Sequence, residues 1–126
     1  MEYLINSTKQ FEKDINKLQK TEANKVISKL NMFINYLKEG KRVDHLISKV
    51  PNIILKFQFS SSLYIFRADL KIRAILSIES DPLFDQKIIT LYRIIKHDEL
   101  ERAINSVVNS LYQSMIDNDG VDYGSN

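Results

Sequence analysis

The sequence predicts an α+β domain with an antiparallel sheet of four to five strands, a helical hairpin before the sheet and one helix after it. Apolar residues recur at helical spacing in two segments near the start of the chain and in one near its end. Between these segments, residues 53–95 contain runs rich in β-branched and aromatic residues, which short turns separate. Because short connections join antiparallel neighbours, these runs predict a sheet of that kind.

The first segment predicts a strand followed by a helix. Residues 2–6 form a short apolar run. Ser7 and Gln10 then have the spacing of a capping box, in which each side chain bonds the free backbone N–H group of the other residue. Phe11 begins the apolar stripe of a helix that we expect to end near Gln19.

A second helix is expected almost at once. Thr21 can cap it, and its apolar stripe runs from Val26 to Leu37. Gly40 supplies the left-handed residue with which many helices end. Because the link between the two helices is so short, we expect an antiparallel helical hairpin whose apolar faces are covered by the sheet.

A connector at 41–52 precedes the predicted sheet, and beyond it the apolar period changes from helical to alternating. In one of the strands Arg73 lies on a mixed face, while the opposite face is apolar. The predicted strands cover residues 53–59, 63–68, 71–79 and 87–95.

The last helix is expected to begin at Asp98, with Glu101 as its capping-box partner, and to continue to about Ile116. Residues 117–126 contain three aspartates, no basic residue and almost no apolar ones, which predicts a disordered acidic tail. The sequence therefore predicts a single domain over residues 1–116.

Composition narrows the classes of function. The 126 residues are 44% hydrophobic and 27% charged, as expected for one domain with a real core. The chain has no cysteine, which excludes disulfides and thiolate metal sites. The first residues lack the pattern of a signal peptide, and no apolar run approaches the roughly 18 residues of a spanning helix. We therefore expect a cytoplasmic protein that does not contact a membrane.

Charge is distributed unevenly along the chain. The net charge is +2, but residues 1–116 alone carry 18 basic and 13 acidic groups, a net charge of +5. A modestly basic domain permits an anionic partner such as nucleic acid without requiring one.

Three stretches, in this order, resemble the RelE/ParE superfamily of toxins from bacterial type II toxin–antitoxin modules. The stretch "STKQFEKDINKL" is similar to the opening of the family, where the chain enters its helical hairpin. "LYIFRADLKIRAIL" is similar to its central β-hairpin, in which one arginine closes a strand and a second opens the next. "LYRIIKHDEL" is similar to its last strand, which often ends in a His-Arg pair. The resemblance covers residues 3 to 112.

The resemblance implies a small cytoplasmic toxin that is neutralised by a cognate antitoxin protein. RelE-like members cut mRNA in the ribosomal A site, so the further partners would be the ribosome and mRNA. Operator DNA would be contacted through the antitoxin complex alone. ParE-like members instead poison DNA gyrase. A third alternative is a non-catalytic relative that binds its partner or DNA and has a regulatory role.

The resemblance also implies site residues. Arg73 matches the arginine that begins the central strand and contacts the scissile phosphate in RelE-like members, and Arg67 matches the arginine that closes the preceding strand. Lys96 and His97 occupy the positions of the His-Arg pair with changed residue types. Two features depart from the nuclease branch: the two arginines lie one residue further apart than usual, and Glu101 stands where that branch has a tyrosine.

The chemistry of RNA cleavage by the 2′-hydroxyl group suits these residue types. The reaction needs a proton acceptor, a cation beside the phosphorus and a proton donor for the leaving oxygen, and it needs no metal or cofactor. Arginine binds phosphate oxygens through its fork, which suits Arg73, assisted by Arg67 or Arg93. Imidazole exchanges protons near neutral pH, which suits His97. Lys96 can act as a base if other cations crowd it.

Further residues are candidates for holding RNA. Lysine and arginine bind the RNA backbone, and tyrosine can stack on bases. Arg93 can equally pair with an acid such as Glu79 or Asp69, and the tyrosines Tyr64 and Tyr92 can simply pack in the core. The candidate RNA-binding residues are Lys56, Lys71, Arg93 and Tyr92.

Overall fold

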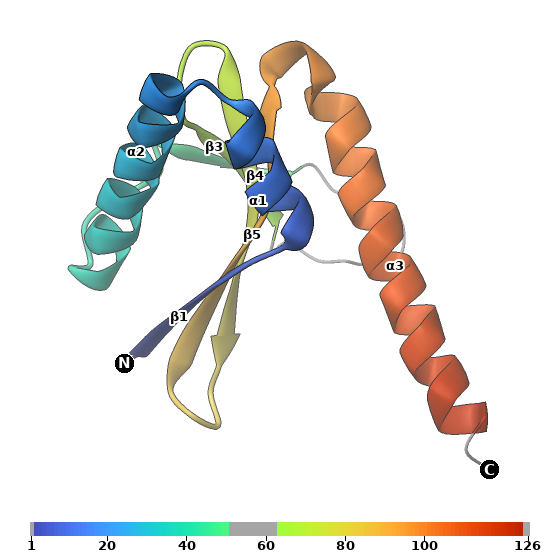
Figure 1. Ribbon diagram of the computed structural model, residues 1–126. Helices are drawn as coiled ribbons and strands as arrows, with labels where there is room; N and C mark the ends of the chain where they lie inside the picture. The colour runs from blue at the N-terminus through green and yellow to red at the C-terminus, as the bar shows by residue number, and fades with distance from the viewer. Residues whose placement is uncertain (1, 51–62, 125–126) are drawn as a thin grey trace.

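The computed structural model describes residues 2–50 and 63–124 (Figure 1). The predicted strand at 53–59, which includes Lys56, lies outside the described residues. In chain order the elements are β1 (Glu2–Ser7), α1 (Lys9–Lys17), α2 (Lys20–Lys38), β2 (Ile47–Lys49), β3 (Leu63–Arg67), β4 (Ile72–Asp81), β5 (Gln86–Lys96), the 3₁₀ turn η2 (His97–Glu99) and α3 (Leu100–Gly124).

The sheet has five strands in the order β1-β5-β4-β3-β2, which confirms the α+β class and the predicted number of strands. It is mixed, however: β1 runs parallel to β5, whereas all other neighbours are antiparallel. The prediction of an antiparallel sheet was therefore wrong for this pair. Short connections join β3, β4 and β5 as antiparallel neighbours, but α1 and α2 separate β1 from the rest, and parallel neighbours need such a long crossover.

The predicted connector at 41–52 contains strand β2, which the sequence did not reveal. Ile47 pairs with Phe66, and Lys49 pairs with Tyr64, so β2 forms an edge of the sheet. The strand has three residues, two of them exposed, and this is too short for an alternating pattern to be recognised.

The start of α1 differs from the prediction by one residue. Ser7 belongs to β1, where it pairs with Leu91, so it cannot cap the helix. Thr8 is the N-cap instead, and its hydroxyl oxygen accepts a hydrogen bond of 3.1 Å from the N–H group of Phe11. Gln10 bonds a buried aspartate rather than a cap. The helix ends at Lys17, two residues before the predicted end.

The predicted caps of the other two helices were also displaced. The N-cap of α2 is Gln19, not Thr21, because the helix begins directly after the short link. Asp98 lies inside η2, so it does not cap α3. At its far end α3 continues to Gly124, beyond the predicted end near Ile116. Once nucleated, a helix gains one hydrogen bond per added residue, so a polar sequence need not stop it.

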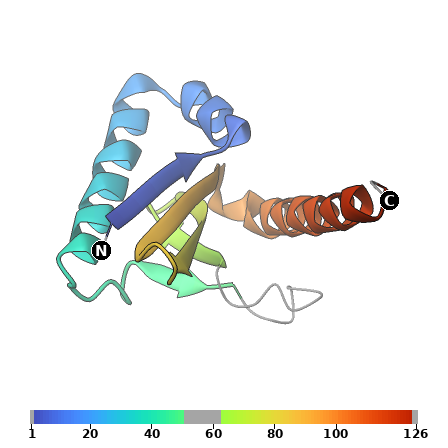
Figure 2. The same cartoon turned by 90° about the horizontal axis from the view of Figure 1, so that it is seen from below.

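The turn after α2 agrees with the sequence. Gly40 has φ +72°, the left-handed conformation predicted for the residue that ends the helix. The hairpin arrangement of the two N-terminal helices is not confirmed, because α1 and α2 diverge from their shared link (Figures 1 and 2). None of the helices, within the residues described, has the length and apolarity that crossing a membrane requires.

The helices cover the sheet on both faces (Figures 1 and 2). On one face, α1 and α2 bury a core that contains Phe33 and Phe66, whose ring centroids lie 5.1 Å apart. On the other face, the first half of α3 packs Ile104 and Val107 against Ile75. The molecule therefore has three layers, with the sheet between α1 and α2 on one side and α3 on the other (Figures 1 and 2). Strand β4 contributes to both cores, through Ile72 on one face and Ile75 on the other.

Candidate functional site

Two arginines lie directly opposite each other at one end of the sheet. Arg67, the last residue of β3, pairs with Arg73 near the start of β4. Arg67 is exposed, and Arg73 is half-buried. Like charges placed directly opposite on neighbouring strands destabilise a sheet, so this pair is better suited to a bound anion than to an empty surface. The structure thus brings together the two arginines that the resemblance singled out.

The arginine pair faces a shallow hollow of about 180 Å³, which we call the arginine hollow. Its walls come from β2, β3, β4 and the turn before β2. None of the described residues that line it is an Asp or Glu, so no carboxylate of that set competes with a ligand for the guanidinium groups. The residues are His45, Leu46, Ile47, Ser48, Ile65, Arg67 and Arg73.

The sequence reasoning missed His45, which lies in the turn before β2. This turn is tied to β3 by its backbone: the N–H group of Arg67 donates to the carbonyl oxygen of Leu46 over 3.2 Å. A second bond, of 2.8 Å from the N–H of Leu46 to the carbonyl of Val43, closes the turn itself. No motif in the sequence marks His45, because the two arginines that share its hollow belong to strands more than 20 residues later.

The guanidinium group of Arg73 also binds the turn between β3 and β4. Its Nη1 atom donates to the carbonyl oxygens of Leu70 and Ile72, over 3.2 and 3.1 Å, and to that of Asp69. Arginine carries five N–H donors, and these bonds use one of its three nitrogens. The turn therefore orients the side chain and leaves further donors for a ligand.

Lys71 and His97 lie at the same end of the sheet. The backbone N–H group of His97 donates to the carbonyl oxygen of Lys71 over 2.7 Å, where β5 passes into η2. Both residues are exposed. Neither belongs to the described lining of the arginine hollow. The structure therefore places them near the arginine pair in the sheet but not in its hollow.

Lys96 lies on the other face of the sheet from Arg73. Arg73 is opposite Ile95, which packs beneath α3. Lys96 is opposite Ile72, which belongs to the core beneath α1 and α2. Because successive residues of a strand point to opposite faces, the two basic side chains point away from each other.

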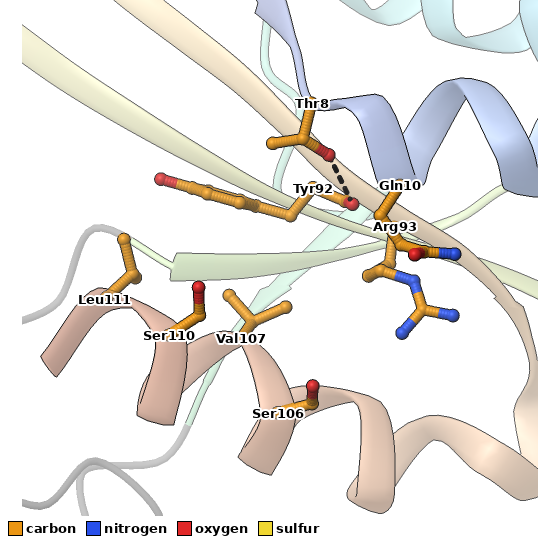
Figure 3. A pocket seen from close by; sticks show the side chains of 8 residues that line it. All are labelled: Thr8, Gln10, Tyr92, Arg93, Ser106, Val107, Ser110 and Leu111. Atoms are coloured by element: carbon orange, nitrogen blue, oxygen red, sulfur yellow. Dashed lines mark hydrogen bonds between the residues drawn. The ribbon is translucent and has the colours of Figure 1, made fainter. Parts of the chain in front are cut away.

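Tyr92 and Arg93 line a different hollow, of about 260 Å³, between the start of α1, strand β5 and α3 (Figure 3). It shares no described lining residue with the arginine hollow. Tyr92 is half-buried against the core beneath α3. Tyr64 is half-buried against the other core, in agreement with the packing alternative for this residue.

A bulge in β5 sets the position of these two residues. Ile75 of β4 pairs with Arg93, whereas the next residue, Leu76, pairs with Leu91, so Tyr92 is an extra residue in the strand. A bulge re-aims side chains and leaves backbone groups without a ladder partner. The hydroxyl of Thr8 donates to the free carbonyl oxygen of Tyr92 over 2.9 Å (Figure 3).

Arg93 is paired with Asp14 of α1, not with Glu79 or Asp69 as the sequence reasoning considered. Its Nε atom lies 2.7 Å from one carboxylate oxygen of Asp14, and its Nη2 atom lies 3.3 Å from the other. The Asp14 side chain is 5% exposed and the Arg93 side chain 24%. The charge of Arg93 is thus largely compensated, which leaves less of it for an anionic ligand.

Asp14 is held in its charged form by its surroundings. Burial by itself raises the pKa of this carboxyl group, but hydrogen bonds from Arg93, Gln10 and the N–H of Ile94, together with the charge of Arg93, outweigh it. The pKa of Asp14 therefore lies below its ordinary value of 3.8.

Together, Thr8 and Asp14 complete the open edge of β5. Pairing with β1 ends at Leu91, and beyond it no strand of the described residues pairs with β5 on this side. The N–H group of Thr8 donates to the carbonyl of Leu91 over 3.0 Å, and the N–H of Ile94 donates to Asp14 over 3.0 Å. The backbone of the N-cap Thr8 and the side chain of Asp14 thus satisfy groups of an edge that would otherwise be free to pair with another chain.

Replacing Thr8 with valine should lower the free energy of unfolding by about 1–2 kcal/mol, since it removes both the helix cap and the donor to Tyr92. Thr8→Ser keeps both bonds and is the matched control. Urea denaturation of the purified proteins measures the difference. Equal stability of the valine variant and the wild type would show that these bonds do not hold α1 in place.

The described residues hold no cluster of three or more histidine, aspartate or glutamate side chains that could bind a metal ion. The two hollows therefore offer guanidinium, imidazole, hydroxyl and amide groups as their polar chemistry. Guanidinium and imidazole groups together are suited to binding an oxyanion and to moving a proton beside it.

Comparison with known proteins identifies a shared fold. No protein-family model matches the chain, and no curated protein matches it. Among solved structures, a chain of the archaeal RelE–RelB complex from Pyrococcus horikoshii is similar, with a TM-score of 0.51 and 18% sequence identity. The likeness covers 76% of this chain and 96% of the other. At this identity it shows the fold alone, which agrees with the architecture that the resemblance implied.

Proposed function

We propose that this protein is the toxin of a type II toxin–antitoxin system and inhibits translation by cutting mRNA on the ribosome. The observation that carries the proposal is the pair Arg67–Arg73, which lies directly opposite on neighbouring strands and lines a hollow with no Asp or Glu among its described residues. Two guanidinium groups on adjacent strands can hold both free oxygens of one phosphodiester. The fold shared with a chain of a RelE–RelB complex supports the same class of protein.

In this proposal the arginines stabilise the charge that develops on the scissile phosphate. Arg73 is oriented by its bonds to the turn, so its fork needs little rearrangement when RNA arrives. Arg67 is exposed and completes the clamp. Lys71, two residues before Arg73, is exposed at the same end of the sheet, where it can contact the neighbouring backbone of the RNA. His97 and Lys96 remain candidates for proton transfer, although neither belongs to the described lining of the hollow.

The expected partner is a cognate antitoxin that covers the arginine hollow. A hollow lined by two guanidinium groups and, among its described residues, by no carboxylate fits an acidic segment of that partner, which would exclude RNA while bound. Operator DNA would be contacted through the complex of the two proteins.

A non-catalytic role is the second candidate, and one observation favours it. The Nη1 bonds of Arg73 to three carbonyl oxygens are also what an arginine with a purely structural role in the turn would make. On this account the protein binds its partner or DNA without cutting RNA. Poisoning of DNA gyrase remains an alternative derived from the resemblance.

Expression of the chain alone, under tight control, separates these functions. The proposal expects growth arrest and new 5′ ends in translated mRNA soon after induction. Arrest with intact mRNA and an induced DNA-damage response would instead favour gyrase. Normal growth with intact mRNA would contradict toxicity and favour the non-catalytic role.

A further inference from the structure

We infer that His45, rather than His97, is the residue that moves the proton in the arginine hollow. The inference rests on the proposed function and deepens it by naming the catalytic base. It depends on where the chain places its two histidines, which the sequence alone did not reveal.

His45 shares the hollow with both arginines. It is exposed, so a ligand can reach the imidazole, and it lines the same space as Arg67 and Arg73. Its position is fixed through the next residue: Leu46 accepts a backbone hydrogen bond from Arg67 and packs against the core beneath α1 and α2. The imidazole therefore belongs to a segment that is anchored to one of the two arginines.

His97 lacks this placement. It begins η2 beyond the end of β5 and does not belong to the described lining of the hollow. Lys96, beside it, points to the opposite face from Arg73. Of the histidines, His45 is thus the one that can reach a phosphate held between the two arginines.

The charged groups described around His45 do not hold its imidazole in an ion pair. Arg67 and Arg73 face it from β3 and β4. The nearest charged groups of its own segment, Arg42 and Asp44, pair with each other at 3.4 Å, and both side chains are largely exposed. No described carboxylate lines the hollow to hold the imidazole in a fixed ion pair.

The chemical step is an internal transfer of the phosphoryl group. The imidazole of His45 accepts the proton of the 2′-hydroxyl as the bond from the 2′-oxygen to phosphorus forms and the bond to the 5′-oxygen breaks. The leaving 5′-oxygen takes a proton from water, and the imidazolium returns its proton to the resulting hydroxide. The products are a 2′,3′-cyclic phosphate and a 5′-hydroxyl end, and no oxidant, reductant or metal takes part.

A binding experiment tests the placement of His45 without relying on RNA cleavage. The chain has two histidines, so its NMR spectrum has two sets of imidazole signals, which His97→Gln assigns. The probe is a dinucleoside phosphate with a 2′-deoxyribose, which cannot be cleaved. We expect it to shift the signals of His45 and not those of His97, and Arg73→Gln to abolish the shift. Shifts of His97 alone, or of neither histidine, would overturn the inference.

Cleavage tests the role. With mRNA-programmed ribosomes, His45→Gln should slow cutting by about 10²–10⁴-fold with unchanged affinity for ribosomes, and His97→Gln should slow it far less. The control Arg42→Ala removes an exposed arginine of the same segment as His45, outside the described lining of the hollow, and should cut normally. Added imidazole should partly restore His45→Ala, which a merely structural role would not allow. If the wild type cuts and His45→Gln cuts as fast, the inference is overturned alone. If the wild type does not cut, the proposed function fails and the catalytic inference fails with it.

Discussion

On the proposed function, we expect replacement of Arg73 with glutamine to slow mRNA cleavage by about 10²–10³-fold, the loss that follows removal of one preorganised donor to a developing oxyanion. Arg73 lies opposite Arg67 and is oriented by the carbonyl groups of the turn between β3 and β4. Glutamine keeps a polar side chain at this half-exposed position but removes the charge and the fork. The cutting rate on mRNA-programmed ribosomes measures the effect.

Two further variants separate the fork from the charge. Arg73→Lys keeps the charge but cannot bind two phosphate oxygens in the same plane, so it should recover little of the lost rate. Arg42→Ala removes one exposed arginine from a surface ion pair outside the lining of the hollow and should cut normally. Denaturation curves establish that all three variants fold. A folded Arg73→Gln variant with full activity would place the phosphate elsewhere.

Replacing Asp14 with alanine will lower the free energy of unfolding by about 3 kcal/mol at neutral pH. The change leaves Arg93 without its partner and the N–H group of Ile94 without an acceptor, and breaking a buried pair by removing one member is costly. Arg93 is partly exposed, so water offsets some of the loss. Urea denaturation measures it. The double variant Asp14→Ala, Arg93→Met should lose less than the two single changes together, because no charge remains unpaired.

The ion pair of Asp14 with Arg93 also predicts how the stability of the fold changes at acid pH. The pKa of Asp14 is lower in the folded protein than its ordinary value of 3.8, so folding favours the charged carboxylate. Its contribution is therefore complete above about pH 3.8 and is lost as the pH falls through the lower, folded pKa. The difference in stability between wild type and Asp14→Ala should shrink as the pH falls below this value. A difference that stays constant would mean that the carboxylate does not carry the effect.

Periodicity in the sequence predicted most of the regular structure. The apolar stripes located α1, α2 and α3, and the alternating runs located β3, β4 and β5. The helices each bury one face, so their sequences record the period of the backbone. Strand β4 is buried on both faces and was located by its run of apolar and β-branched residues. Strand β2 and the parallel pairing of β1 escaped prediction, since a three-residue edge strand has no period and local sequence does not encode which distant strand is the neighbour.

Local signals were less reliable at the helix ends. Ser7 and Thr8 are both good N-caps, and the choice between them was made by tertiary structure: Ser7 pairs with Leu91 in the sheet. The ion pair of Arg93 was not predicted from the sequence for a related reason. Its partner Asp14 is 79 residues away in the sequence and meets it because α1 covers the open edge of β5.

The candidate site was predicted in part. Arg67 and Arg73 are brought together because they flank one β-hairpin, a relation that is local in sequence. Lys96 is separated from them by the alternation of β5, which places it on the opposite face. His45 reaches the hollow through the pairing of β2 with β3, and that pairing could not be read from the sequence.

The central claim is that Arg67 and Arg73 hold the phosphate at which ribosome-bound mRNA is cut. The most direct test incubates the purified protein with ribosomes stalled on a defined mRNA and maps the 5′ ends, beside the same mRNA without ribosomes. The account predicts 5′-hydroxyl ends at the codon in the A site. These ends should disappear with the double variant Arg67→Gln, Arg73→Gln. Intact mRNA on the ribosomes, with wild-type protein that is folded, would contradict it.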